Sequence, residues 1–175
     1  MEKEEKEVVE SPRNKYNCLM LKFDIKNWSS FVNNLIEPED IYLTEKEGYG
    51  LELNCHITLL FGIHDYVPLE EVKKYLVPIK FIKCKTNTID TFQNPKFDVV
   101  KFNVEGNYLK QMNKDLRDNI DYTSDYPEYK AHATIAYLNP GTGKKYKRNM
   151  SNMLIMKPVS YVYSHADGTK EEFVL

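Results

Sequence analysis

"CHITLLFGI" (residues 55–63) has the apolar composition of a buried strand, and so has "AHATIAYL" (residues 131–138). Each segment nevertheless contains a histidine followed two residues later by a threonine: His56 with Thr58, and His132 with Thr134. Successive strand side chains point to opposite faces, so each histidine shares a face with its threonine. The sequence therefore predicts two strands that bury one face and present imidazoles and hydroxyls on the other.

Strict alternation extends this prediction to the rest of both strands. It places Leu60 and Ala136 on the faces that carry the histidines, and Phe61 and Tyr137 on the opposite, core faces. The side chains of one face then pack in the core, while those of the other face can line a ligand site.

The surroundings of these two strands repeat along the chain. "LKFDI" (21–25), a helical pattern and then "HIT" correspond to "VKFNV" (100–104), a helical pattern and then "HAT". We predict an α+β fold of two similar lobes, about 18–61 and 97–138, with antiparallel sheets around a central cleft. A pseudo-two-fold axis between the lobes would bring both His/Thr pairs into that cleft.

The remaining segments complete a single domain over residues 16–175. Alternating patterns predict strands over 81–92 and 97–104, apolar spacing predicts a helix after Pro68, and Asp167-Gly168 predicts a hairpin turn. Residues 1–15 are highly charged without an apolar signal-peptide core, so we predict a flexible tail and a cytoplasmic protein. No apolar run approaches the ~20 residues of a membrane span, so no membrane partner is expected.

Composition narrows the ligand classes. The chain has 175 residues, of which 42% are hydrophobic and 29% charged, as in an ordinary globular domain. Its net charge of -2 argues against binding long nucleic acid, which needs a basic excess, but leaves room for a small anionic ligand. The three cysteines lie in apolar runs and indicate free thiols. Cys55 and His56 point to opposite strand faces, so no metal site or cofactor is predicted.

Two imidazoles and two hydroxyls in one cleft suit a displacement at phosphorus. One histidine can take a proton from an attacking hydroxyl while the other gives one to the leaving oxygen. The threonine hydroxyls can hold the non-bridging phosphate oxygens as negative charge builds on them. A single histidine in an apolar strand is more often a hydrogen-bonded core residue, but two copies at matching places in a repeat favour a shared site.

The sequence resembles the 2H phosphoesterases, or LigT-like proteins, because H-I-T-L and H-A-T-I both fit His, apolar, Thr or Ser, apolar. The resemblance covers roughly residues 16–175 and implies a bilobal α+β fold with metal-independent phosphodiester chemistry. By motif position it implies that His56 and His132 are the acid–base pair and that Thr58 and Thr134 bind the phosphate.

Five further residues are candidate substrate ligands. Lys22 and Lys101 occupy matching positions of the repeat, and each alternates away from the apolar face of its strand, toward the cleft or toward solvent. Aromatic rings stack on nucleobases, and Tyr16, Tyr161 and Tyr163 flank the expected cleft strands, although packing is the commoner role of tyrosine.

The resemblance also bears on the substrate. The wording of "HITLLFGI", the tyrosine content and the C-terminal "DGTKEEF" are similar to bacteriophage anti-CBASS phosphodiesterases, which implies cyclic di- and trinucleotide immune signals as substrates. A phosphodiesterase for 2′-5′ oligoadenylate or for 2′,3′-cyclic phosphates on RNA ends is the alternative enzyme. A non-catalytic nucleotide sponge is the alternative of another class. The sequence leaves the oligomeric state and the assignment of acid and base open.

Overall fold

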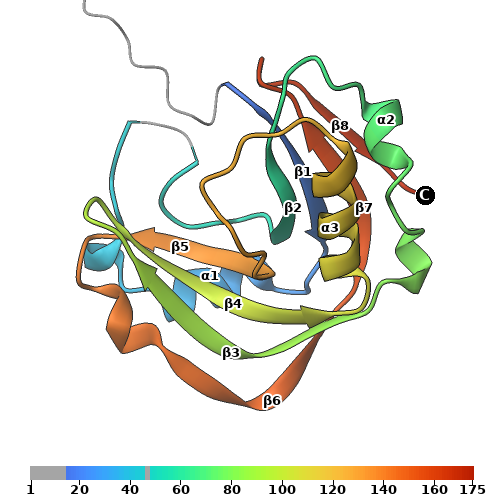
Figure 1. Ribbon diagram of the computed structural model, residues 1–175. Helices are drawn as coiled ribbons and strands as arrows, with labels where there is room; N and C mark the ends of the chain where they lie inside the picture. The colour runs from blue at the N-terminus through green and yellow to red at the C-terminus, as the bar shows by residue number, and fades with distance from the viewer. Residues whose placement is uncertain (1–14, 46–47) are drawn as a thin grey trace, which may run out of the picture.

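A single eight-stranded antiparallel sheet forms the framework of the computed structural model, which describes residues 15–45 and 48–175 (Figure 1). The predicted tail lies outside the described residues except for Lys15. The strand order is β6-β3-β4-β5-β2-β1-β7-β8. The strands are β1 (Asn17–Phe23), β2 (His56–Ile63), β3 (Cys84–Gln93), β4 (Asp98–Gly106), β5 (His132–Leu138), β6 (Arg148–Met156), β7 (Pro158–Ser164) and β8 (Lys170–Phe173). The helices are α1 (Trp28–Leu35), α2 (Leu69–Lys73) and α3 (Leu109–Asn119), with short 3-10 turns at Pro38–Asp40, Ile79–Phe81 and Gly143–Tyr146.

The sheet has two halves that repeat outward from its centre. β2 and β5 are central neighbours, paired antiparallel through Ile57 and Ala133. Outside β2 lie β1, β7 and β8, which with it form lobe 1; outside β5 lie β4, β3 and β6, which with it form lobe 2. The predicted fold class, two pseudo-symmetric α+β lobes with antiparallel strands, is confirmed.

The two longest helices, α1 and α3, cover one face of the sheet, and each packs against the lobe to which its flanking strands do not belong. α1 connects strands of lobe 1, yet the rings of Trp28 and Phe31 pack against Phe102 of β4 in lobe 2. α3 connects strands of lobe 2, yet Asn113 donates to the carbonyl of Leu59 in β2, and α3 lies over lobe 1 in Figure 1. Because each helix buries apolar side chains on the other lobe, at roughly 1.5–3 kcal/mol for each large side chain, the lobes share one core.

β2 and β5 contain the same β-bulge. In β2, Thr58 pairs with Met20 and Leu60 with Leu19, so that Leu59 is left without a partner on β1. The ladder between β5 and β4 skips Ile135 in the same way, one residue after Thr134. A bulge places two consecutive side chains on nearly the same side of a strand.

This bulge changes which side chains reach the uncovered face. Leu60 and Ala136 are buried, whereas Phe61 and Tyr137 are half-exposed beyond each bulge. The prediction from strict alternation was therefore wrong beyond Thr58 and Thr134. An aromatic ring, and not an aliphatic side chain, follows each His/Thr pair on the open face.

The far end of each central strand is hydrogen-bonded to the loop that precedes the other central strand. Tyr137 N–H donates to the Gly50 carbonyl, and Thr123 N–H donates to the Gly62 carbonyl. The second contact needs glycine, because Gly62 has φ +87° and a Cβ there would lie 1.9 Å from the Thr123 oxygen. The loops before β2 and β5 are thus fixed beside the His/Thr face.

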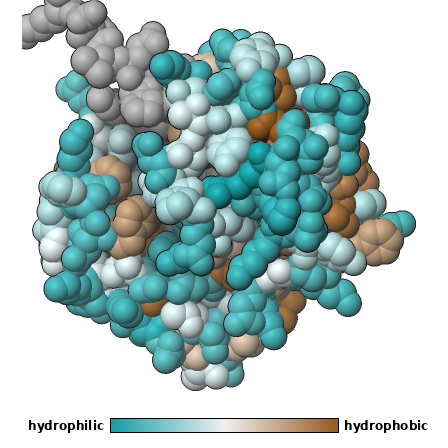
Figure 2. Space-filling model, viewed as in Figure 1, coloured by the Kyte–Doolittle hydropathy of each residue, from teal (hydrophilic) through white to brown (hydrophobic). Residues whose placement is uncertain are grey.

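The predicted C-terminal hairpin is present between β7 and β8, with Gly168 at φ +90°. The surface in Figure 2 is mainly hydrophilic, with hydrophobic residues in separate spots. None of the helices in the described ranges is long and apolar enough to cross a membrane.

Candidate active site

The two His/Thr pairs meet at the centre of the face that the helices leave uncovered. All four side chains are half-buried, while Ile57 and Ala133 between them are fully buried on the other face. Continuing the Ile57–Ala133 register places His56 opposite Thr134 and Thr58 opposite His132. Cβ atoms of such cross-strand pairs lie about 5 Å apart, so the four groups can contact one small ligand.

Both imidazoles are held in the same orientation and tautomer. His56 Nδ1 lies 2.9 Å from the Asn54 carbonyl oxygen, and His132 Nδ1 lies 2.9 Å from the Lys130 carbonyl oxygen. A carbonyl only accepts, so each Nδ1 carries its hydrogen and each neutral ring keeps the lone pair on Nε2. Nε2 is therefore the atom that either histidine offers for proton transfer.

The surroundings of His132 favour its neutral form. Burial lowers the pKa of His132 below its usual value, and the nearby charges of Lys101 and His56 act in the same direction. The hydrogen bond to the Lys130 carbonyl opposes this shift without cancelling it. His132 is thus suited to accept a proton near neutral pH.

Cross-strand pairing arranges the open face in two rows. The first, which we call the His56 row, runs through Ser160, Lys22, His56, Thr134, Lys101 and Asp90. The second, the His132 row, runs through Val162, Met20, Thr58, His132, Asn103 and Thr88. Both lysines lie in the His56 row, and between β7 and β3 His132 is the only ionisable side chain of the His132 row, whose continuation onto β8 pairs Val162 with Glu172.

The rows show that Lys22 and Lys101 are not symmetry mates. Lys22 pairs with His56, and the residue that pairs with His132 is Asn103. Lys101 pairs with Thr134, and the residue that pairs with Thr58 is Met20. The prediction of matching positions was therefore wrong by two residues, although both lysines belong to the face that carries the histidines.

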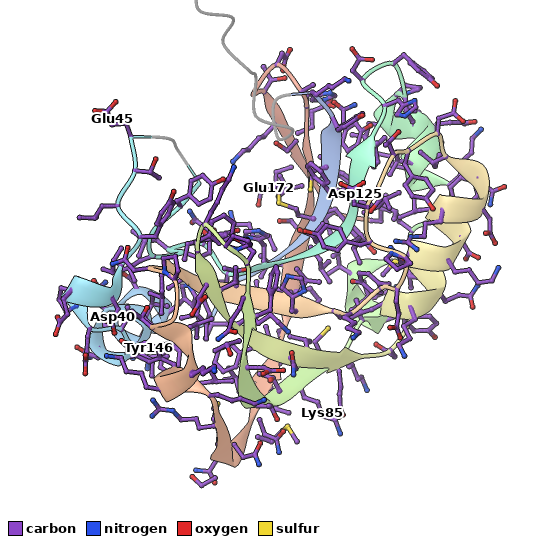
Figure 3. The ribbon with its side chains drawn as sticks, turned by 60° about the vertical axis from the view of Figure 1, so that its left-hand side comes forward. Asp40, Glu45, Lys85, Asp125, Tyr146 and Glu172 are labelled. Carbon is purple, nitrogen blue, oxygen red and sulfur yellow. The ribbon has the colours of Figure 1, made fainter. Side chains whose placement is uncertain are left out.

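The two lysines have different partners. Lys22 Nζ lies 3.2 Å from Glu172 Oε1 in an exposed ion pair. Glu172, labelled in Figure 3, belongs to the edge strand β8. Lys101 is more buried and donates to Asn103 Oδ1 at 2.6 Å. Asn103 in turn donates to Asp90 Oδ2 at 3.0 Å. The sequence reasoning missed Asn103 and Asp90, although Asn103 has the same strand parity as Lys101.

The aromatic candidates divide into exposed and buried groups. Tyr16 is half-buried and stacks on His64, with Phe61 at its edge, beyond the His/Thr pair of β2. A second cluster, of Tyr137, Tyr49, Phe97 and Tyr42, lies beyond the pair of β5. Each cluster thus adjoins one end of the His/Thr group.

Tyr161 and Tyr163 do not reach the open face. Both are fully buried, and their hydroxyls donate to the carbonyls of Val77 and Val67. They belong to the face under α3, so the interpretation of them as base-stacking residues was wrong. Alternation in β7 places them on the core side together with Leu21 and Leu19 of β1.

Cys55 and Cys84 are buried free thiols, and Cys18 is half-buried. Burial raises the pKa of Cys55 to about 12 and that of Cys84 to about 12, so neither is a thiolate near neutral pH. In the described ranges no group of three or more His, Cys, Asp or Glu side chains is placed to hold a metal ion. A pocket of about 390 Å³ lies at the end of β1, lined among others by Lys22, Asn54 and Trp28.

Structures with this fold have been solved. The chain is similar to the structure of Kluyveromyces marxianus Usb1, with a TM-score of 0.54 and 8% identity over 94% of this chain and 100% of that one. It is similar also to Kluyveromyces marxianus Usb1 with uridine monophosphate, with a TM-score of 0.55 and 6% identity over 93% of this chain and 100% of that one. No protein-family model and no curated protein matches the sequence. At such low identity the similarity supports the 2H phosphoesterase-like fold, and activity must be argued from the site.

Proposed function

We propose that this protein is a phosphodiesterase that cleaves a small nucleotide substrate by histidine acid–base catalysis without a metal. The observation that carries the proposal is the juxtaposition of two His/Thr pairs across β2 and β5, with both Nε2 atoms available. The similarity in fold to Usb1, including its structure with uridine monophosphate, supports a nucleotide as the ligand.

The asymmetry of the site suggests which histidine is the base. His132, neutral for the reasons above, takes the proton of a ribose 2′-hydroxyl on Nε2 as that oxygen bonds to the adjacent phosphorus. The bond from phosphorus to the 5′-oxygen breaks, and His56 gives its Nε2 proton to that oxygen. Thr58 and Thr134 donate to the non-bridging oxygens as charge builds on them. The products are a 2′,3′-cyclic phosphate and a free 5′-hydroxyl.

The same groups can open the cyclic phosphate with their roles reversed. His56, now neutral, takes a proton from water as the water oxygen bonds to phosphorus. His132, now protonated, gives its proton to the ribose oxygen whose bond to phosphorus breaks. The histidines return to their starting protonation states, so the cycle closes without a cofactor.

Cyclic di- and trinucleotides are the proposed substrates, with evasion of host CBASS defence by a bacteriophage as the biological setting. The likeness of "HITLLFGI" and "DGTKEEF" to the phage enzymes supports this choice, as does the net charge of -2, which disfavours long RNA. Activity on RNA ends is the second candidate. The likeness to Usb1 with uridine monophosphate favours it.

The deciding experiment incubates the full chain with cyclic dinucleotides, cyclic trinucleotides, 2′-5′ oligoadenylate, 2′,3′-cyclic mononucleotides and a short RNA, and identifies products by mass spectrometry. We expect turnover of a cyclic oligonucleotide that persists in EDTA. His56→Ala and His132→Ala should each lower turnover by about 10²–10⁴-fold.

His165→Ala is the matched control, because His165 lies in the β7–β8 hairpin outside both rows, with its Nε2 2.7 Å from Glu171 Oε2, and its substitution should leave turnover within a few-fold of wild type. Release of unchanged ligand by wild type and both variants would instead establish a sponge. Loss of activity in EDTA with active histidine variants would exclude the mechanism.

A further inference from the structure

The open face is symmetric in its histidines and threonines and asymmetric in its charge. Lys101 in β4 and Met20 in β1 occupy corresponding positions, each paired with the threonine of the neighbouring central strand. The same backbone position thus carries an ammonium in lobe 2 and a thioether in lobe 1. The fold itself does not require a lysine there.

Lys101 is costly to keep at this position. Its side chain is half-buried, and burial lowers the pKa of Lys101, whereas the charge of Asp90 opposes the shift. Its hydrogen-bond acceptor is the neutral oxygen of Asn103, and the carboxylate of Asp90 is reached only through that amide. Asp90 is also shared, because Lys147 Nζ lies 3.5 Å from its Oδ1. A buried charge is normally retained where it has a direct counter-charge.

A phosphodiester at the His/Thr pairs would supply that counter-charge. An ammonium has three hydrogens, and the hydrogen bond that the structure gives Lys101 uses one of them. Lys101 stands beside Thr134, whose hydroxyl is proposed to hold a non-bridging oxygen. Lys22, at the other end of the same row, is already held by both carboxylate oxygens of Glu172.

We propose that Lys101 is a phosphate ligand of this site, which with Thr134 binds one non-bridging oxygen and so fixes the direction in which the phosphodiester lies across the two rows. This assignment rests on the proposed function, since it concerns the same site. It makes the His56 row the anion-binding side and leaves His132, in the row without a lysine, to act on the attacking hydroxyl. Asn103 and Asp90 are positioning residues for the ammonium.

The test replaces Lys101 by the residue that lobe 1 has at the same position. Lys101→Met should lower kcat/KM by about 10- to 100-fold, the effect of losing a charge-assisted hydrogen bond, and Lys101→Arg should restore part of it. Lys85→Met is the charge-matched control on β3, because the side chain of Lys85 (Figure 3) is exposed and lies outside both rows, so its loss should change kcat/KM less than threefold. A Lys101→Met protein with wild-type kcat/KM, or a Lys85→Met protein with the same loss, overturns the assignment.

A pH profile separates phosphate binding from a merely structural role. The charged or titratable groups that influence His132 are Lys101 from β4 and His56 from β2, and Lys101 itself is influenced by Asp90 and Lys130. Removing the Lys101 charge lets the pKa of His132 rise, so the acidic limb of the kcat/KM profile should move to higher pH in Lys101→Met. An unmoved limb contradicts the assignment.

Inorganic phosphate tests the ligand independently of turnover. Titrated into wild type and observed through the amide NMR signals of Thr134 and His132, it should bind at least tenfold more weakly to Lys101→Met. If wild type binds phosphate in this way but cleaves no nucleotide in the panel, the proposed function fails and the assignment of Lys101 stands. Equal phosphate affinity in the two proteins refutes the assignment even if wild type is active.

Discussion

The halves of the open face agree in backbone and differ in side chains. Each central strand begins with a histidine whose Nδ1 binds a carbonyl two residues earlier, and each has a bulge one residue after its threonine. Flanking residues break this symmetry: β1 presents Met20 and Lys22, whereas β4 presents Lys101 and Asn103. A symmetric framework thus holds a site in which both lysines lie in the His56 row and none lies in the His132 row.

This difference matters for the proposed mechanism, in which one histidine must be protonated while the other is neutral. Two identical imidazoles in a symmetric setting would titrate together, so neither would be preferred as the base. The lysine beside Thr134 and the burial of the His132 ring favour the neutral form of His132 and so remove that degeneracy. The differences between the two lobes therefore determine which histidine acts as the base in the proposed mechanism.

Among the comparisons between the two halves, removal of the threonine hydroxyls should have the largest effect on kcat. Thr58→Val and Thr134→Val keep the side-chain shape and delete one donor to the phosphate. We expect kcat to fall by about 10²–10³-fold in Thr58→Val, because Met20 beside it cannot compensate, and by about tenfold in Thr134→Val, because Lys101 remains. Steady-state kinetics on the substrate found in the panel measures both values.

The double variant Lys101→Met/Thr134→Val is the control for this interpretation. If Lys101 and Thr134 share one phosphate oxygen, the combined loss should exceed the product of the two single losses. Equal losses for Thr58→Val and Thr134→Val would show that the two rows hold the phosphate alike and would remove the mechanistic asymmetry.

The glycine at the far end of β2 tests another break in the symmetry. Gly62 corresponds to Leu138 in β5, and only Gly62 has a positive φ and backbone packed against its Cα. Gly62→Ala should lower the free energy of unfolding by about 2–4 kcal/mol, the sum of left-handed strain and a steric clash. Urea denaturation followed by circular dichroism measures the loss.

Gly168→Ala separates strain from the clash. Gly168 also has a positive φ, but nothing lies within 4 Å of a Cβ at that position. Its substitution should therefore cost only the backbone term, about 1–2 kcal/mol. If both variants lose the same amount, the contact between Gly62 and the Thr123 carbonyl contributes nothing to stability.

The sequence predicted the parts of the fold that have a local signal. Two helices show apolar spacing of three and four residues, and the observed α1 and α3 lie where the repeat predicts a helix, between each first strand and its His/Thr strand. The repeat predicted the two-fold arrangement because both halves kept the order strand, helix, His/Thr strand. β6 was missed, because as an edge strand it exposes side chains on both faces and shows neither period.

The side-chain details had no such signal. A bulge depends on the pairing partner, so nothing within "HITLLFGI" announces that Phe61 turns to the open face. The shift of Lys101 against Lys22 has the same origin, since it is defined only once each strand is paired with its neighbour. For Tyr161 and Tyr163 the error was of another kind. They were chosen because tyrosine can stack on a base, although alternation along β7 places both side chains on the core face.

The smallest expected effect compares the acids that accompany the two lysines. Asp90 accepts hydrogen bonds from Asn103 and from its neighbour Thr91, and its side chain is 28% exposed, against 51% for Glu172. Asp90→Asn should lower the free energy of unfolding at pH 7 by about 0.5–1.5 kcal/mol, whereas Glu172→Gln should produce no measurable change. Urea denaturation at pH 7 and at pH 3 measures both.

The sign of the pH dependence follows from the folded-state shift. The hydrogen bond from Asn103 lowers the pKa of Asp90, so this carboxylate stabilises the fold above its ordinary pKa and ceases to do so as the pH falls through the lowered value. The difference between wild type and Asp90→Asn should therefore shrink at pH 3. A loss in Glu172→Gln as large as in Asp90→Asn would contradict the distinction between the lobes.

Asp90 also raises the pKa of Lys101, so in Asp90→Asn the ammonium should lose its proton at lower pH, and the alkaline decline of activity should begin at lower pH than in wild type.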